Sequence, residues 1–238
     1  MEDARARTVV VTGATGSLGR AVARAFGERG ANLVLIGHRT EALASAFGDE
    51  HPRRMLAAAD LVHRDQADAA MRAARERFGR IDVLCNVAGG FRAGDDVHEA
   101  SDADWDFLFD INVRTLVNAV RATVPQMIAG GGGSIVNVGA QGALKGVAGM
   151  GAYCAAKSAV LRLTEAMAAE LRGRKITVNC ILPTILDTPE NRKAMPDADP
   201  AQWVSPDDCA KVFVFLASEE GRAINGASIT VSGTRAER

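Results

Sequence analysis

Short apolar runs rich in β-branched residues alternate along this chain with longer segments whose apolar residues recur at helical spacing. The short runs predict strands at residues 8–12, 32–36, 55–60, 81–86, 134–139, 176–181 and 227–231. The longer segments predict helices near residues 17–29, 40–47, 65–78, 102–129, 153–172 and 206–218. Several strand runs are apolar without alternation, which is typical of strands covered on both faces. The pattern therefore predicts an α/β fold, a single doubly wound domain over residues 1–238 with a parallel sheet of about seven strands.

One long stretch, residues 183–205, has no clear period and contains four of the seven prolines. Irregular segments of this length in compact domains usually form lids or binding loops, or are disordered. We therefore expect a substrate loop in this region.

Composition narrows the choice of partner. The 238 residues carry 28 Lys and Arg against 29 Asp and Glu, a formal net charge of -1, so no global attraction for nucleic acid or an anionic membrane exists. No apolar run reaches the roughly 18 residues of a membrane span, and no signal-peptide core follows the charged start. The four cysteines are far apart, as expected of reduced thiols. We expect a cytoplasmic protein that acts on a small molecule and holds no metal.

Three glycines recur at every third position between the first predicted strand and the first predicted helix. Glycine permits a tight turn and a close approach of the backbone to a pyrophosphate, which the free N–H groups of the helix N-terminus then bind. An unliganded glycine-rich turn is the alternative. The position at the chain start favours a Rossmann-type dinucleotide site. Its predicted contacts are Gly13, Thr15, Gly16, Ser17, Leu18 and Gly19.

The residues after the second predicted strand indicate which dinucleotide is bound. An NAD site usually places an acid there for the ribose hydroxyls, whereas this chain has His38 and Arg39. Arg39, with His38 beside it, is suited to pair with the 2′-phosphate of NADP. The alternative is a solvated surface arginine, in which case NAD is the cofactor.

Tyr153 and Lys157 stand at i and i+4 on a predicted helix, which places both side chains on one face. A free tyrosine, with a pKa of about 10, is a poor acid or base at neutral pH. A nearby ammonium favours the phenolate, so we expect Lys157 to lower the pKa of Tyr153. Such pairs also occur on ordinary helices, and only the glycine turn upstream makes a catalytic role the better interpretation.

Together the glycine turn and the Tyr-x-x-x-Lys spacing resemble the short-chain dehydrogenase/reductase superfamily over nearly the whole chain. The resemblance implies that Asn112 holds a proton-relay water, that Tyr153 is the general acid/base, and that Lys157 binds the nicotinamide ribose and tunes the tyrosine. It further implies cofactor contacts from Asp60, Leu61, Asn86, Ala88, Gly89, Pro183 and Thr188, as well as from Tyr153 and Lys157 themselves.

Two departures from the commonest pattern of that superfamily stand out. The glycines are spaced Gly-x-x-Gly-x-x-Gly, and the serine position thirteen residues before Tyr153 holds Ala140. Alanine has no hydroxyl to polarise a carbonyl. Ser134 lies at the start of its strand, too far away to substitute, and Gln141 is a candidate donor to the substrate.

Both departures are similar to the dihydropteridine reductases, which also resemble this chain in a long segment of the irregular region, residues 182–199. The resemblance implies a conjugated substrate such as quinonoid dihydropteridine, whose ring spreads the incoming charge. It also implies that Asp187 and Asn191, with Arg192, shape the substrate mouth. Those reductases generally use NADH, whereas Arg39 favours NADPH.

Two other readings remain open. One is a general carbonyl or 3-oxoacyl reductase, or an alcohol dehydrogenase, of the same superfamily. The other is a non-catalytic NADP-binding protein, against which the intact Tyr153, Lys157 and Asn112 argue. The superfamily commonly pairs the helices that correspond to residues 102–129 and 153–172, and alanines recur along the second, so we expect a homodimer or homotetramer.

Overall fold

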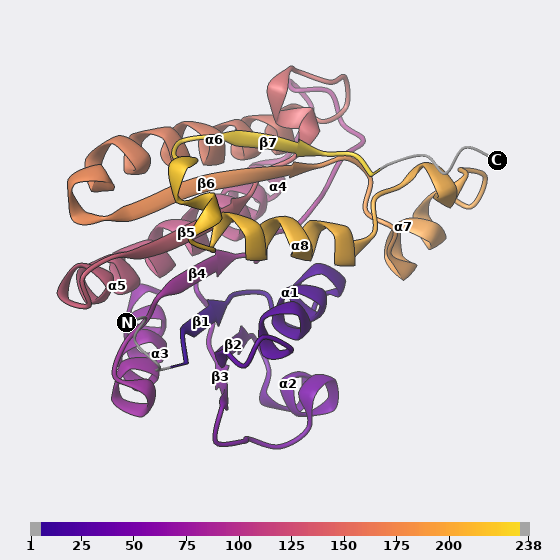
Figure 1. Ribbon diagram of the computed structural model, residues 1–238. Helices are drawn as coiled ribbons and strands as arrows, with labels where there is room; N and C mark the ends of the chain where they lie inside the picture. Colours follow the sequence, from indigo (N-terminus) through magenta and orange to yellow (C-terminus); the bar gives the residue numbers. More distant parts are fainter. Residues whose placement is uncertain (1–5, 234–238) are drawn as a thin grey trace.

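A parallel sheet forms the centre of the protein, as seen in a computed structural model that describes residues 6–233 (Figure 1). Within those residues its strands run in the order β3-β2-β1-β4-β5-β6-β7. Every neighbouring pair is parallel, which confirms the predicted doubly wound architecture. The strand bounds are β1 Thr8–Val11, β2 Asn32–Gly37, β3 Arg54–Ala58, β4 Val83–Asn86, β5 Gly133–Val138, β6 Ile176–Pro183 and β7 Ser228–Val231.

Helices cover both faces of the sheet, because the strands are apolar on both sides. Along β1, Val9 and Val11 face one core and Val10 faces the other. The first core includes α1 (Ser17–Gly27), α2 (Thr40–Phe47) and α8 (Pro206–Leu216). The second includes α3 (Arg64–Phe78), α5 (Thr115–Ala129) and α6 (Gly151–Leu171). Both cores together fix the orientation of the strand ends.

Strand β1 lies between β2 and β4, so the chain turns in opposite directions on the two sides of β1. At such a switch point the loops that follow neighbouring strands diverge and leave a crevice at the carboxyl edge of the sheet. The loops after β1, β2, β3, β4, β5 and β6 all begin at this edge. They hold the site residues predicted outside the helices, except Asn86 and Pro183, which are the last residues of β4 and β6.

Two predicted elements differ in detail. The predicted helix over residues 102–129 is divided into α4 (Asp102–Phe109), a π-helical turn (Asp110–Arg114) and α5. Residues 183–205 are not wholly irregular, since they contain α7 (Pro189–Ala194), which lies beyond the carboxyl ends of the strands (Figure 1). An isolated parallel bridge between Leu186 and Val204 closes that segment. Sequence periodicity missed α7 because a helix of six residues is too short to show a helical period.

Two absences hold for residues 6–233. No helix there is both long enough and apolar enough to cross a membrane. No group of three or more His, Cys, Asp or Glu side chains within that range is placed to hold a metal ion. The four cysteines are all buried and unpaired.

Candidate active site

The turn after β1 is built for close backbone contact. Gly13 has φ +60°, and a Cβ there would lie 2.8 Å from the Ala88 Cα, so only glycine fits. A Cβ at Gly19 would collide with the Gly13 carbonyl oxygen. A Cβ at Gly16, in contrast, meets nothing closer than 3.5 Å, and the turn is open there towards the crevice. Because α1 begins at Ser17 with no acidic residue in its first turn, this end of the helix suits an anion.

Thr12 joins this turn to the loop after β4. Its hydroxyl oxygen accepts hydrogen bonds from the backbone N–H groups of Val87 and Ala88, both at 3.0 Å. Asn86, expected to contact a cofactor, is buried, and its amide Nδ2 donates to Asn137 Oδ1 at 2.9 Å. The Asn86 side chain is therefore a contact between neighbouring strands, and its contact with a cofactor stays a prediction.

Arg39 and His38 are exposed at the carboxyl end of β2, next to the glycine turn. Among residues 6–233, Arg39 makes no ion pair and no side-chain hydrogen bond. Gly37 brings the backbone here close to the turn, since a Cβ at Gly37 would meet the Thr15 methyl group at 3.3 Å. The guanidinium is thus free to bind an anion beside the predicted pyrophosphate position.

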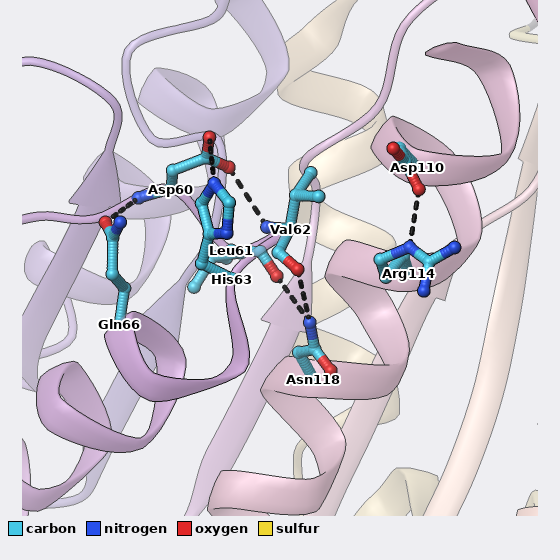
Figure 2. Close-up of polar contacts among 8 residues, drawn as sticks. All are labelled: Asp60, Leu61, Val62, His63, Gln66, Asp110, Arg114 and Asn118. Atoms are coloured by element: carbon cyan, nitrogen blue, oxygen red, sulfur yellow. Dashed lines mark hydrogen bonds and ion pairs between the residues drawn. The ribbon is translucent and has the colours of Figure 1, made fainter. Parts of the chain in front are cut away.

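The turn after β3 is organised around Asp60, whose carboxylate and backbone N–H both make contacts within the turn (Figure 2). Asp60 Oδ1 accepts from the Val62 N–H at 3.0 Å, while Oδ2 lies 3.8 Å from His63 Nε2. The Asp60 N–H donates to Gln66 Oε1 at 2.8 Å. The Leu61 N–H finds no acceptor among the described residues. A carboxylate oxygen beside a free N–H matches the N6 amino group and N1 of an adenine, so this turn fits an adenine ring.

Asn112 and Lys157 converge on the loop after β4. A Cβ at Gly89 would lie 2.9 Å from Asn112 Oδ1 and 3.2 Å from Lys157 Nζ. Lys157 is only 5% exposed and donates from Nζ to the Val138 carbonyl at 2.9 Å. Tyr153 lies one helical turn before Lys157, near the start of α6. The structure therefore brings the three predicted catalytic residues to one edge of the sheet.

Asn112 is held in the π-helical turn between α4 and α5. Its Nδ2 donates to the carbonyls of Gly90 and Leu108, at 3.0 and 2.9 Å, and its Oδ1 accepts from the Gly90 N–H at 3.2 Å. Single π turns inside helices frequently mark functional sites. Here the π-helical turn places Asn112 so that its side chain fixes the loop after β4, which lies between Asn112 and Lys157.

Burial sets the proton affinities at this site. Desolvation raises the pKa of Tyr153 to about 12, with a smaller contribution from Cys154. Desolvation also lowers the pKa of Lys157 to about 8, against a smaller opposing effect of Cys180. We expected Lys157 to lower the pKa of Tyr153, and the structure corrects that expectation, because the Lys157 ammonium is directed to the Val138 carbonyl and burial dominates.

The position of the missing serine lies directly after β5. Ala140 precedes a short 3-10 turn (Gln141–Leu144), and the Gln141 side chain is exposed with no hydrogen-bond partner among residues 6–233. Ser134, at the opposite end of the six-residue strand, donates to the Leu216 carbonyl at 3.2 Å. With about 3.3 Å per strand residue, Ser134 is far from Tyr153, as expected. Gln141 is therefore the polar side chain nearest in sequence to the vacant donor position.

The residues predicted to shape the substrate mouth instead bond to one another. Thr188 caps α7 by accepting from the Asn191 N–H at 3.2 Å, and Asn191 Nδ2 donates to the Leu186 carbonyl at 2.8 Å. Arg192 donates to both carboxylate oxygens of Asp187, at 2.6 and 2.8 Å, and holds the pKa of Asp187 below its ordinary value. These contacts hold α7 in place beyond the buried Pro183.

Exposed apolar side chains, for which the sequence carried no expectation, lie in the loops at the catalytic edge. The aromatic rings of Phe91 and Tyr153 lie with centroids 4.9 Å apart. Phe91 directly follows the Gly89-Gly90 pair, and this position is the sequence feature that could have identified it as a site residue. The exposed apolar residues in the loops after β4, β5 and β6 are Phe91, Val97, Leu144, Val147 and Ile185, and we call them the apolar rim.

Comparisons with known proteins agree with this geometry. The short chain dehydrogenase family model matches residues 7–199. D-threitol dehydrogenase of Mycolicibacterium smegmatis is 34% identical, over 95% of this chain and 92% of that protein. The structure of 3-ketoacyl-(acyl-carrier-protein) reductase from Brucella melitensis, complexed with NADH, has a TM-score of 0.86 at 27% identity and covers 98% of this chain and 99% of its own.

L-sorbose reductase from Gluconobacter frateurii, complexed with NADPH and L-sorbose, is similarly close in structure. Its TM-score is 0.86 at 28% identity, with 98% of each chain covered. The family model thus matches most of the chain, and both solved structures cover nearly all of it. The protein belongs to the short-chain dehydrogenase family of oxidoreductases.

Proposed function

We propose that this protein is an NADPH-dependent reductase, with NADH as the alternative cofactor, that reduces a conjugated ring such as quinonoid dihydropteridine. The observation that carries the proposal is Ala140, two residues after the Val138 carbonyl that Lys157 contacts, at the position where the family resemblance implies a serine hydroxyl that polarises a ketone. Reduction of a ketone develops negative charge on one oxygen, which needs donors placed around it. A conjugated ring spreads that charge over several atoms, so the missing hydroxyl matters less.

Tyr153 is the proton donor in this proposal. With a pKa of about 12 its hydroxyl keeps its proton at neutral pH but is a weak acid, so proton transfer depends on stabilisation of the phenolate that forms. Lys157, whose pKa is about 8, is mostly protonated at pH 7 and stabilises the phenolate that remains after proton transfer. Asn112 fixes the backbone beside both groups. Nicotinamide supplies the hydride when the cofactor is bound.

The cofactor-binding residues follow the crevice along the carboxyl edge. The open backbone at Gly16 and the N-terminus of α1 receive the pyrophosphate, and Arg39 pairs with a 2′-phosphate. Asp60 and the free Leu61 N–H bind the adenine edge. Support for a dinucleotide also comes from the relatives crystallised with NADH and with NADPH.

The apolar rim indicates which kind of substrate the site binds. Phe91 stands next to Tyr153, so a substrate atom that receives a proton from the Tyr153 hydroxyl brings its neighbouring atoms against an aromatic ring. Arg92, the next residue, is already paired with Asp104 at 2.6 Å and stacked on Phe107, so its charge is balanced. The site therefore favours a flat, weakly polar substrate over a small, strongly hydrated one.

A general carbonyl or 3-oxoacyl reductase is the second candidate, and Gln141 favours it. Its side-chain amide is exposed beside Ala140 and has no partner in residues 6–233, so it is free to donate to a carbonyl oxygen. The names of the relatives, a 3-ketoacyl reductase and a sorbose reductase among them, support this candidate as well.

Cofactor oxidation followed at 340 nm separates the two candidates. We expect fast oxidation of NADPH with quinonoid dihydropteridine generated in situ, and slow oxidation with simple ketones and 3-oxoacyl thioesters. Turnover of a carbonyl panel with none of the dihydropteridine would reject the first candidate in favour of the second. A protein that binds NADPH but reduces neither class would support the non-catalytic reading.

We also propose that the protein assembles in the cytoplasm as a homodimer or homotetramer through residues 102–129 (α4 to α5) and 153–172 (α6). Apolar side chains gather between α4 and α6, and the rings of Trp105 and Phe109 on α4 stack with centroids 6.0 Å apart. Half-buried aromatic pairs on a helix surface commonly pack against a second chain. Light scattering at micromolar concentration should give at least twice the mass of one chain, and a monomer would contradict the proposal.

A further inference from the structure

One side chain of helix α5 reaches back to the turn that follows β3 (Figure 2). Asn118 is 4% exposed, and its Nδ2 donates to the carbonyls of Leu61 and Val62, both at 2.9 Å. Both N–H groups of one amide are thus used on two consecutive peptide groups of that turn. Neither carbonyl lies in a helix or strand, so sheet or helix hydrogen bonds do not account for this contact.

The contact extends beyond the carbonyls themselves. The peptide group between Leu61 and Val62 accepts from Asn118 at its carbonyl and donates from its N–H to Asp60 Oδ1 at 3.0 Å. A hydrogen bond at one end of a peptide group strengthens the bond at its other end. Asn118 is therefore connected through one peptide group to the Asp60 carboxylate, and it fixes the plane in which that carboxylate lies.

On the opposite side of the turn, Gln66 performs a similar task. Its Oε1 accepts from the Asp60 N–H at 2.8 Å, so this N–H faces away from the crevice. The hydrogen bonds of Asn118 and Gln66 leave two polar groups of this turn for a ligand, the Leu61 N–H and Asp60 Oδ2. Asp60 Oδ2 has only the His63 ring near it, at 3.8 Å. The turn thus presents one donor and one acceptor whose relative positions are fixed.

We infer that Asn118 is a positioning residue that sets the specificity of this turn for adenine. The inference rests on the dinucleotide site of the proposed function. Adenine offers an amino hydrogen to Asp60 and a ring nitrogen to the Leu61 N–H. Hypoxanthine, which has an oxygen and a ring N–H at the corresponding atoms, would set acceptor against acceptor and donor against donor. Asn118 acts through the Leu61–Val62 peptide and does not touch the base.

The test compares binding of NADPH with that of deamino-NADPH, which carries hypoxanthine in place of adenine, by nicotinamide fluorescence. The wild-type protein should bind NADPH about tenfold more tightly, as expected for the loss of two hydrogen bonds. Asn118→Ser should reduce this ratio to about twofold by weakening NADPH binding, with deamino-NADPH binding little changed. The matched control is Asn179→Ser, because the Asn179 amide is also buried and donates to a backbone carbonyl, that of Ile224 at 2.8 Å.

A role limited to stability would give a different result. Asn118→Ser would then weaken both nucleotides equally, as Asn179→Ser would, and an unchanged ratio overturns the inference. Should Asn118→Ser fail to fold, Gln66→Ala tests the same turn, because Gln66 is exposed and its removal should also narrow the ratio. A wild-type protein that binds both nucleotides equally overturns the positioning role but leaves the cofactor assignment intact. Failure to bind either nucleotide rejects the proposed function itself.

Discussion

The rings of Phe91 and Tyr153 meet at 83° with their centroids 4.9 Å apart, the edge-to-face arrangement that aromatic pairs favour. Phe91 comes from the loop after β4 and Tyr153 from the start of α6, so the pair joins two loops at the catalytic edge. With 60% of its surface exposed, Phe91 still has a large apolar area to offer a substrate. This relationship makes Phe91 the first residue to test for substrate recognition.

Replacing Phe91 with alanine should raise KM for a conjugated-ring substrate by about two- to tenfold, the loss expected for one aromatic contact. The KM for NADPH should stay the same. Phe215→Ala is the matched control, since Phe215 is also exposed but lies on α8. Steady-state kinetics of both variants provide the measurement, and equal KM values in the two would contradict the role of Phe91.

Tyr153→Phe removes the proton donor and keeps the ring. Turnover should fall by about 10²- to 10⁴-fold, the usual contribution of a general acid. NADPH binding, measured by fluorescence, should weaken far less than turnover, because the glycine turn and Arg39 are untouched and only the Tyr153 hydroxyl contact with the cofactor is lost. Activity that survives this change would show that another group delivers the proton.

Restoring a hydroxyl with Ala140→Ser should increase turnover of simple ketones by about tenfold or more, because a donor then faces the developing alkoxide. Reduction of quinonoid dihydropteridine should change little. The companion variant, Gln141→Ala, separates the two proposed functions. If Gln141 already serves as the donor, Gln141→Ala lowers ketone turnover and Ala140→Ser does not increase it.

Arg39→Ala should weaken NADPH binding by about ten- to a hundredfold and leave NADH binding unchanged, because only NADPH carries the 2′-phosphate. Arg121→Ala, which removes an exposed arginine on α5, is the control for net charge. The measurement is the dissociation constant of each cofactor for the wild-type protein and both variants, which shows whether Arg39 binds the 2′-phosphate. A parallel loss for the two cofactors, or no loss, would make Arg39 an ordinary surface residue.

The buried Lys157 should change how stability depends on pH within a narrow window. Its pKa is about 8 in the folded protein against an ordinary value of 10.5, so above pH 8 the unfolded chain binds a proton that the folded protein does not. The contribution of Lys157 to the free energy of unfolding therefore rises with pH from about pH 8. Burial raises the pKa of Cys85, Cys180 and Cys209 above the ordinary 9.0, which offsets the contribution of Lys157 between about pH 8 and 9 and lowers the stability above that range.

Urea unfolding of the reduced protein between pH 7.5 and 9 measures this effect. The wild-type protein should keep nearly constant stability from pH 8 to 9, because the gain from Lys157 offsets the loss from the three cysteines. Lys157→Met should lose about 1 kcal/mol over the same range, because it carries no titratable group at this position. Tyr153 does not interfere, since its raised pKa acts only above pH 10. The same slope in both proteins would mean that Lys157 is not desolvated in solution.

Local sequence determined much of this protein. The β-branched runs specify strands because unbroken apolar side chains are stable only when both faces of the sheet are covered. The glycine spacing specifies the turn after β1, since the positive φ of Gly13 and its closeness to Ala88 admit no side chain. The i, i+4 spacing of Tyr153 and Lys157 fixes their common helix face before any tertiary contact forms.

Tertiary structure decided what depends on residues distant in the chain. Asn118 gains its role only where α5 passes the turn after β3, fifty-six and fifty-seven positions away along the chain. The pKa values of Tyr153 and Lys157 follow from burial, which the helix spacing alone does not reveal, and so the expected direction for Tyr153 was wrong. The sequence does not distinguish Phe91 from other apolar residues, and only the fold places its ring in contact with that of Tyr153. Spacing along the chain fixes local geometry, whereas desolvation and long-range hydrogen bonds exist only after the strands have assembled.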